Sequence, residues 1–125
     1  MTTPSFPPLF SGLAVEGQID PFEKACAEAA RGCDAGLVVY NLGANTLRAA
    51  LVFAPDVALA KAMAMLPLCG VGFQNALGAL APPEVAVHLE WAGGVRINGA
   101  SCGKLRVTAS SADPASEPDW LVVGL

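Results

Sequence analysis

The stretch Val87 to Val107, VHLEWAGGVRINGASCGKLRV, holds the strongest candidates for chemistry in this chain. Its Gly103-Lys104 pair resembles the end of a phosphate-binding loop, in which backbone amides surround a phosphate and the lysine binds it. Such a loop needs four residues between its glycines and a Ser or Thr after the lysine. Here three residues separate Gly99 from Gly103, and Leu105 follows Lys104. We therefore interpret the match as coincidental.

Other possible catalytic arrangements in this stretch each lack a required residue. His88 and Glu90 share one face of a predicted strand, but no Ser, Cys or Asp completes a triad, so a solvated face is favoured. Cys102 lies beside Gly103 and Lys104, yet no basic partner for a nucleophile is evident. The four cysteines show no C-x-x-C spacing and the chain has a single His, so we predict no metal site and reduced, buried thiols.

Composition excludes several classes of protein. The 125 residues predict one domain, and 54% are hydrophobic, which argues against disorder. Seven Lys and Arg against eleven Asp and Glu, without a basic cluster, exclude direct nucleic-acid binding. The longest apolar stretch, residues 58–68, is shorter than the ~20 residues of a membrane span. The amino terminus lacks a signal-peptide pattern, so we expect a cytoplasmic protein without a membrane segment.

The pattern of capping, apolar and turn residues predicts an α+β domain with a mixed or antiparallel sheet packed on helices. Asp20-Pro21 is a helix start, and Asn98-Gly99 is the strongest hairpin signal. Pro67 is expected to end the second helix, and the third, apolar nearly all round, is expected to be buried. Predicted helices span residues 21–32, 57–66 and 70–80, and predicted strands 9–16, 35–40, 47–53, 85–91, 94–97, 100–110 and 120–125.

The last predicted strand runs to the end of the sequence, an unusual place for a domain to finish. Our hypothesis is that residues 1–125 form the N-terminal part of a longer protein. An incomplete sheet would leave an exposed edge, so pairing of two chains into a homodimer stays open.

The order of these elements resembles the catalytic domain of the biotin/lipoate protein ligases over roughly Leu9 to Leu125. Residues 90–94, Glu-Trp-Ala-Gly-Gly, match the K-W-P-N-D strand end of the biotin branch, and residues 100–107 match its K-x-x-G-I/L-L-V hairpin. The resemblance implies a ligase-like (class II synthetase-like) fold. It also implies ATP-dependent activation of biotin or lipoate/octanoate, and transfer of the acyl group to a lysine of a biotin/lipoyl carrier domain.

Two of the departures from that pattern remove positive charge, and a third removes an acidic residue. The family's basic glycine-rich loop corresponds to residues 41–46, Asn-Leu-Gly-Ala-Asn-Thr, which contain no Arg. The catalytic-site lysine maps to Ala100, and the acidic residue of K-W-P-N-D maps to Gly94. Adenylate formation concentrates negative charge, and each missing donor costs ~10²–10³ in rate.

Lys104 is the one catalytic candidate that the hairpin supplies. Ala100, Cys102 and Lys104 share a face if no bulge intervenes, with Lys104 ~13 Å from Ala100 at ~3.3 Å per residue. Arg96 is expected opposite Ser101 across a two-residue turn. A rival register, which matches the lipoate branch's K-I-S-G-S-A to residues 96–101, would make Arg96 the cation. The candidate ligand-binding residues are Trp91, Gly93, Gly94, Arg96, Asn98, Ala100 and Gly103.

Two functions follow from this reading. The first is a biotin/lipoate ligase-like protein that attaches biotin or a lipoyl/octanoyl group to a carrier lysine. The second is a catalytically inactive relative that binds a small acyl ligand or a carrier-like protein. The sequence leaves both open.

Overall fold

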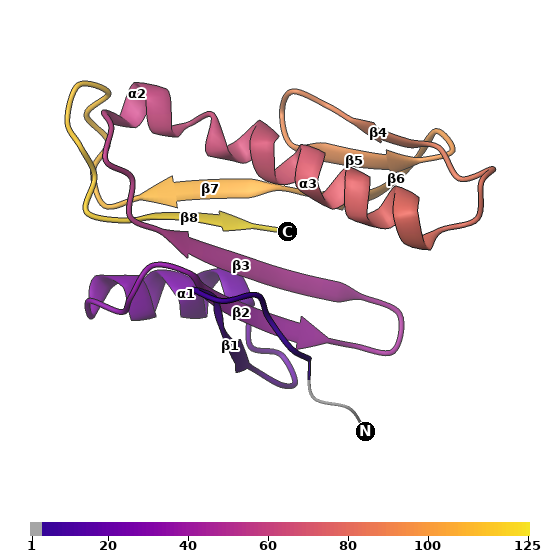
Figure 1. The fold of residues 1–125 in the computed structure, drawn as a ribbon, viewed down its shortest axis with the longest axis horizontal. Coiled ribbons are helices and arrows are strands. Elements are labelled where there is room, and N and C mark those ends of the chain that lie inside the picture. The colour runs from indigo at the N-terminus through magenta and orange to yellow at the C-terminus, as the bar shows by residue number, and fades with distance from the viewer. Residues whose placement is uncertain (1–3) are drawn as a thin grey trace.

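The computed structural model describes residues 4–125 and has a layered α+β architecture (Figure 1). Helix α1 (Pro21–Ala30) packs on one face of a five-stranded sheet, and helix α3 (Met65–Leu80) and a three-stranded sheet lie on the other. The five-stranded sheet has the order β1-β2-β3-β8-β7, and the three-stranded sheet β4-β5-β6. The strands are β1 (Ser11–Ala14), β2 (Leu37–Leu42), β3 (Leu47–Phe53), β4 (Val87–Leu89), β5 (Gly94–Ile97), β6 (Ala100–Lys104), β7 (Arg106–Ala109) and β8 (Leu121–Gly124).

The predicted fold class is confirmed. Strands β1 and β2 pair in parallel, and every other strand pair that the structure describes is antiparallel, which makes the larger sheet mixed. Figure 1 shows the C-terminal strand β8 inside the molecule, with α1 and α3 on opposite sides of its sheet.

Strand β8 joins the two halves of the core. Leu121 and Val122 are fully buried and Val123 is 1% exposed. Val122 packs in the cluster beneath α1, whereas Leu121 and Val123 pack in the cluster beneath α3 and the smaller sheet. Alternate side chains of one strand point to opposite faces, so this short apolar strand contributes to both clusters.

Helix α1 begins as the sequence predicts. The Asp20 carboxylate accepts a hydrogen bond from the backbone N–H of Phe22 at 3.0 Å, and Pro21 occupies the first helical position. Asp20 also binds the guanidinium of Arg106 on β7 at 3.0 Å, and Arg106 lies over the Phe22 ring. The cap therefore ties the start of α1 to the edge of the sheet.

Pro67 does not end a helix, contrary to the prediction. The helical segment divides earlier, into α2 (Leu59–Ala62) and α3, and Pro67 lies in the first turn of α3. Proline is tolerated there because a first-turn N–H has no partner within the helix.

Helix α3 is also less buried than its composition predicts. Of its residues only Gly70 is buried, while Leu68 is 59% exposed and Leu80 is 87% exposed. One side of the helix packs on β4 and β8, and much of the rest of its surface is exposed. An apolar surface all round the helix therefore does not imply burial all round.

Helices α2 and α3 together, Leu59–Leu80, form 22 residues that are long and apolar enough, by length and composition alone, to cross a membrane. Our estimate from residues 58–68 missed this because it did not join that stretch to the predicted helix over residues 70–80. Only 6% of that apolar window is buried, and one segment of this kind does not establish a membrane span, so the absence of a membrane segment stays a prediction.

The Asn98-Gly99 hairpin is confirmed. Asn98 (φ 50°) and Gly99 (φ 85°) both adopt the positive φ of a type I′ turn between β5 and β6. The predicted strand 100–110, however, is two strands. Leu105 separates β6 from β7, which belong to different sheets, and it is 5% exposed.

The predicted strand 85–91 is shorter than expected, since only Val87–Leu89 pairs with β5. Trp91 does not continue the buried face of Val87 and Leu89. It lies in the turn closed by the Gly93 N–H to Glu90 C=O hydrogen bond of 2.9 Å, and it is 93% exposed.

Replacing Asp20 with Ala should lower the free energy of unfolding by about 1–2 kcal/mol, because the helix cap and the Arg106 ion pair are both lost. Asp20→Asn keeps a capping side chain and should lose less. Urea unfolding at neutral pH measures the free energy of unfolding of both variants. Equal losses in the two would show that the cap contributes little.

Asp20 should also contribute to acid sensitivity. Burial opposes ionisation, but hydrogen bonds from Arg106 and the Phe22 N–H outweigh it and hold the pKa below its usual value of 3.8. A carboxyl whose pKa is lower in the folded than in the unfolded state stabilises the fold at pH values above its unfolded-state pKa. That stabilisation is lost as the pH falls through the folded-state pKa. The stability difference between the wild type and Asp20→Asn should therefore shrink in acid.

Candidate functional site

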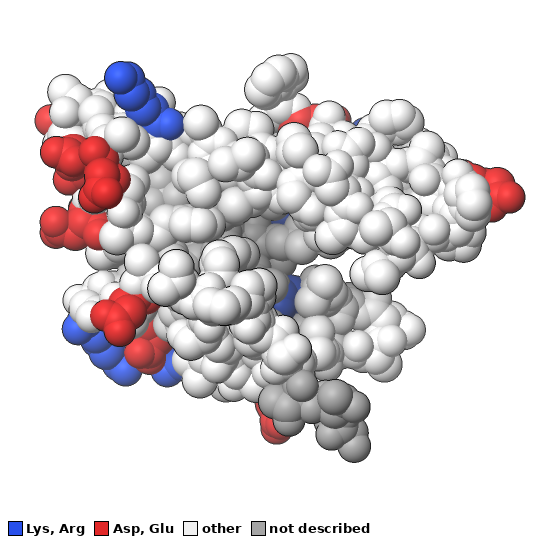
Figure 2. All heavy atoms as spheres, in the orientation of Figure 1, with Lys and Arg blue, Asp and Glu red and all other residues white. Residues whose placement is uncertain are grey.

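The largest described cavity, which we call the lysine cavity, has a volume of about 440 Å³ and lies between the β2–β3 turn, α3 and the β5–β6 hairpin. Figure 2 shows that the surface is hollowed between the α3 layer and the β2–β3 turn, and that most of the surrounding surface carries no charge. Its lining residues are Asn45, Thr46, Leu47, Phe73, Leu77, Val95, Ile97, Cys102, Gly103, Lys104 and Leu125.

Lys104 is the only Lys or Arg among the residues that line this cavity. Four of the other cations form ion pairs with carboxylates within 4 Å: Lys24, Arg31, Arg96 and Arg106. Within residues 4–125, Lys104 has neither an ion pair nor a side-chain hydrogen bond. Its ammonium charge is therefore available to an anionic ligand.

The loop that corresponds to the family's basic segment also reaches this cavity. Asn45 and Thr46 line it, and the loop is closed by a 2.9 Å hydrogen bond from the Gly43 N–H to the Thr46 carbonyl. Asn41, at the start of the loop, is 7% exposed and donates to the carbonyls of Gly17 and Ile19 at 3.2 Å. The loop thus offers neutral polar groups where the family pattern has arginines.

Arg96 lies elsewhere. It is opposite Ser101, as predicted, and its guanidinium contacts the Glu90 carboxylate at 3.3 Å and donates to the Gly99 carbonyl at 3.0 Å. It lines none of the cavities described in this structure. The cation of the rival register is therefore engaged by its own hairpin.

A bulge changes the faces of β6. Val95 pairs with Gly103 and Arg96 with Ser101, which leaves Cys102 as the extra residue, with its thiol 3.4 Å from the Val95 carbonyl. The simple alternation expected for this strand is broken. Cys102 and Lys104 line the lysine cavity, whereas Ala100 is exposed and does not.

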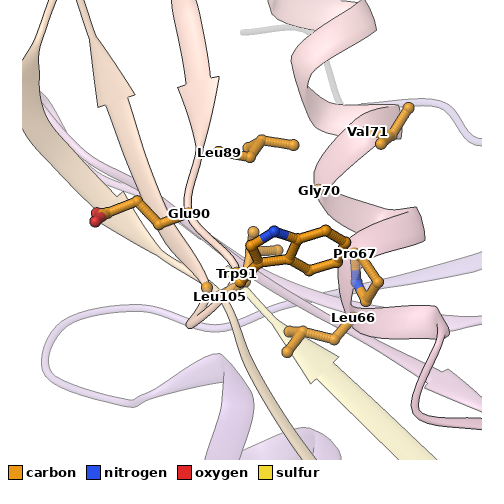
Figure 3. A pocket seen from close by; sticks show the side chains of 9 residues that line it. Leu66, Pro67, Gly70, Val71, Leu89, Glu90, Trp91 and Leu105 are labelled. Atoms are coloured by element: carbon orange, nitrogen blue, oxygen red, sulfur yellow. The ribbon is translucent and has the colours of Figure 1, made fainter.

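Trp91 and Gly93 line a different and smaller cavity, of about 160 Å³ (Figure 3). Trp91 lines this cavity together with Leu66 and Pro67 of α3 and with Leu105, and it is itself 93% exposed. The structure therefore separates these two predicted ligand-binding residues from Gly103 and Lys104.

The remaining candidates have evident structural roles. Gly93 has φ 100°, and a Cβ there would collide with the backbone oxygen of Leu105, whose N–H donates to the Gly93 carbonyl at 2.6 Å. A Cβ at Gly94 would collide with the Glu90 carboxylate. The Asn98 side chain accepts a 2.9 Å hydrogen bond from the Ala86 N–H.

The sequence analysis missed a third cavity, of about 300 Å³, between α3 and the five-stranded sheet; we call it the apolar cavity. It is lined by Ala49, Leu51, Cys69, Gly72, Phe73, Leu105, Val123, Gly124 and Leu125. Phe73 and Leu125 line both this cavity and the lysine cavity, so the two adjoin. The small and apolar residues 69–73 were the sequence feature that could have indicated this cavity. The strands that face them, however, lie far away in the sequence.

Metal ligation finds no support in the described part of the chain. In residues 4–125, no three His, Cys, Asp or Glu side chains are grouped closely enough to hold a metal ion. The chemistry of the lysine cavity is therefore that of one ammonium group, neutral polar groups and apolar walls.

Comparison with known proteins agrees with this architecture. Residues 6–125 match the sequence profile of the biotin/lipoate A/B protein ligase family. The chain belongs to this family. Among curated proteins, none matches this chain.

One solved relative is highly similar. The crystal structure of a biotin protein ligase-like protein of unknown function from Silicibacter sp. TM1040 is 69% identical, with a TM-score of 0.95. The alignment covers 98% of this chain and 54% of that chain, so the biotin/lipoate ligase-like domain described here spans about half the length of that relative.

The structural role of Gly93 can be tested against Gly99, which also has a positive φ but whose added Cβ would meet no atom within 4 Å. Both Gly→Ala variants should lose stability through backbone strain of ~1–3 kcal/mol. Gly93→Ala should lose more, because it also displaces the Leu105 backbone. Thermal unfolding measures the difference, and equal losses would contradict the close contact with Leu105.

Proposed function

We propose that this domain of the biotin/lipoate A/B protein ligase family binds a small acyl carboxylate in the lysine cavity. The observation that carries the proposal is the ammonium of Lys104, which forms no ion pair within residues 4–125, at a largely apolar cavity of about 440 Å³. An apolar cavity with few polar groups suits a small organic acid, since the walls bind the acyl part and the cation binds the carboxylate. The family makes biotin and lipoate or octanoate the acids of choice.

The second candidate is catalysis by the intact protein: ATP-dependent attachment of biotin or a lipoyl/octanoyl group to a lysine of a carrier domain. Membership of the ligase family favours it. One cation at the cavity is few for an adenylate, whose formation places negative charge on several phosphate oxygens. We therefore propose that this chain alone binds acid without efficient activation, and that any ligase reaction uses further cations of the intact protein, in the cytoplasm.

Substituting Lys104 with Ala should weaken binding of biotin, lipoate or octanoate about tenfold, since a hydrogen bond to a charged group contributes ~1.5–3 kcal/mol and solvent screens part of it. Titration calorimetry measures the dissociation constant. Lys61→Ala is the matched control, because Lys61 lies on α2 and lines none of the described cavities. Equal affinity of wild type and Lys104→Ala would remove Lys104 from the site.

Pyrophosphate release separates the two candidate functions. The 125-residue chain with ATP, magnesium and each acid should release pyrophosphate no faster than a sample without the acid, although calorimetry detects the bound acid. Release that depends on the acid and is lost in Lys104→Ala would instead establish activation by this chain unaided.

A further inference from the structure

We propose that the exposed face of helix α3 binds the same face of a second copy of this chain, through an antiparallel contact between the two α3 helices. Three properties of the face point to this partner: its lack of charge, the spacing of its exposed residues and the position of Asn75.

The outer face of α3 is apolar and exposed along the length of the helix. Leu68 is 59% exposed, Val71 is 45% exposed and Leu80 is 87% exposed. No charged residue occurs between Lys61 and Glu84, and Figure 2 shows a largely uncharged surface over α3. Contiguous apolar surface is rare on soluble monomers and marks surfaces that bind a partner. This face of α3 therefore requires an occupant.

The exposed residues follow the spacing of a contact between two helices. They succeed one another at steps of four and three residues, and each of them is exposed: Ala64, which immediately precedes α3, and Leu68, Val71, Asn75 and Gly78. Alternating steps of four and three residues place side chains along one narrow line of a helix, along which a second helix packs. We call these five residues the α3 seam. Its spacing indicates that the occupant is another helix.

Asn75 makes the α3 seam complementary to itself. A carboxamide carries both donors and an acceptor, so two Asn75 side chains that meet at a two-fold axis are able to hydrogen-bond to each other. A single Asn in a helix–helix seam also fixes the register of the pair. About an axis at Asn75, Val71 approaches the partner's Gly78. An added Cβ at Gly78 meets no atom within 4 Å, so this position leaves room for the branched side chain.

A lipid surface fits the same face less well. Helices that bind membrane surfaces carry Lys or Arg beside their apolar face, whereas α3 contains neither. The inner side of α3 is also held in the domain, because the Gln74 side-chain amide donates to the Val87 carbonyl of β4 at 2.8 Å. Insertion across a membrane would break this hydrogen bond and separate α3 from the strands on which it packs.

The size of the contact indicates a weak dimer. Helix α3 has 16 residues, which corresponds to a length of about 24 Å at 1.5 Å per residue. A strip of that length and about 10 Å in width is smaller than the ~800 Å² per partner of a standard interface. We therefore expect a reversible dimer whose dissociation constant is roughly micromolar or weaker.

Sedimentation equilibrium of the 125-residue chain over a range of concentrations measures this association. Leu68→Glu places a like charge on both copies of the α3 seam and should weaken the dimer by more than about tenfold, because like charges in an interface repel. Leu42→Glu is the matched control, since Leu42 is also 59% exposed but lies on β2. It should keep the association of the wild type.

A charge exchange at Asn75 tests whether the two copies meet at the proposed axis. Asn75→Asp and Asn75→Lys should each be monomeric at concentrations where the wild type dimerises, because each brings two like charges together. An equal mixture of the two variants should form a heterodimer, since opposite charges then meet. Mixing would not restore an association that was lost through misfolding.

Other occupants of the face would give different results. A wild-type chain that stays monomeric at its highest soluble concentration would overturn the proposal and leave the face to a different polypeptide, such as a segment of the kind that the longer relative contains. Dimerisation that Leu68→Glu leaves intact would place the contact elsewhere and also overturn it. A mixture of the Asn75 variants that stays monomeric would exclude the two-fold contact. Binding of the wild type, but not of Leu68→Glu, to phosphatidylcholine vesicles would assign the face to lipid instead.

Discussion

The burial of one short strand constrains the whole domain. Strand β8 lies between β3 and β7, and its successive residues Leu121, Val122 and Val123 are almost fully buried. Helix α1 requires an apolar surface on one face of this strand, and α3 with the smaller sheet requires one on the other. A strand covered on both faces cannot alternate polar and apolar residues, which is why WLVVGL is uniformly apolar. The lysine and apolar cavities lie where the coverage by α3 is incomplete.

Several Lys and Arg side chains form structural ion pairs, which leaves few cations to bind a ligand. Arg106 binds Asp20 and covers Phe22, and Arg96 neutralises Glu90 within its hairpin. These pairs fix elements in place but offer no free charge to a ligand. Lys104 is an exception because it lies at the end of β6, where no carboxylate approaches it within the described residues. The domain keeps the frame of its family, while this cavity has little of the positive charge that adenylate chemistry needs.

Local signals in the sequence predicted the parts of the fold that depend on local physics. Asp20-Pro21 fixes a helix start and Asn98-Gly99 fixes a type I′ turn, since both depend on neighbouring backbone alone. The errors arose where tertiary packing decides. Pro67 is compatible with either the end or the first turn of a helix, and only the packing of α3 selects between them. Trp91 leaves the buried face because the strand ends at Leu89 and residues 90–93 form a turn.

In the candidate site, too, local sequence predicted some features, while others depend on tertiary packing. The hairpin placed Arg96 opposite Ser101 correctly, but the bulge at Cys102 could not be read from an alternating pattern. Gly72, Phe73 and Leu125 come together only after folding, so the small and apolar residues 69–73 could not reveal which elements face them.

The single-residue crossing at Leu105 has a thermodynamic consequence. The chain passes there from one sheet to the other, and Leu105 shares a cluster with Leu121 and Val123 of β8. Melting of either sheet would expose the cluster that it shares with the other, so we expect the domain to unfold as one cooperative unit. Any molecule held beside the hairpin then raises the melting temperature of α1 as much as that of the strands it touches, by mass action on a shared equilibrium.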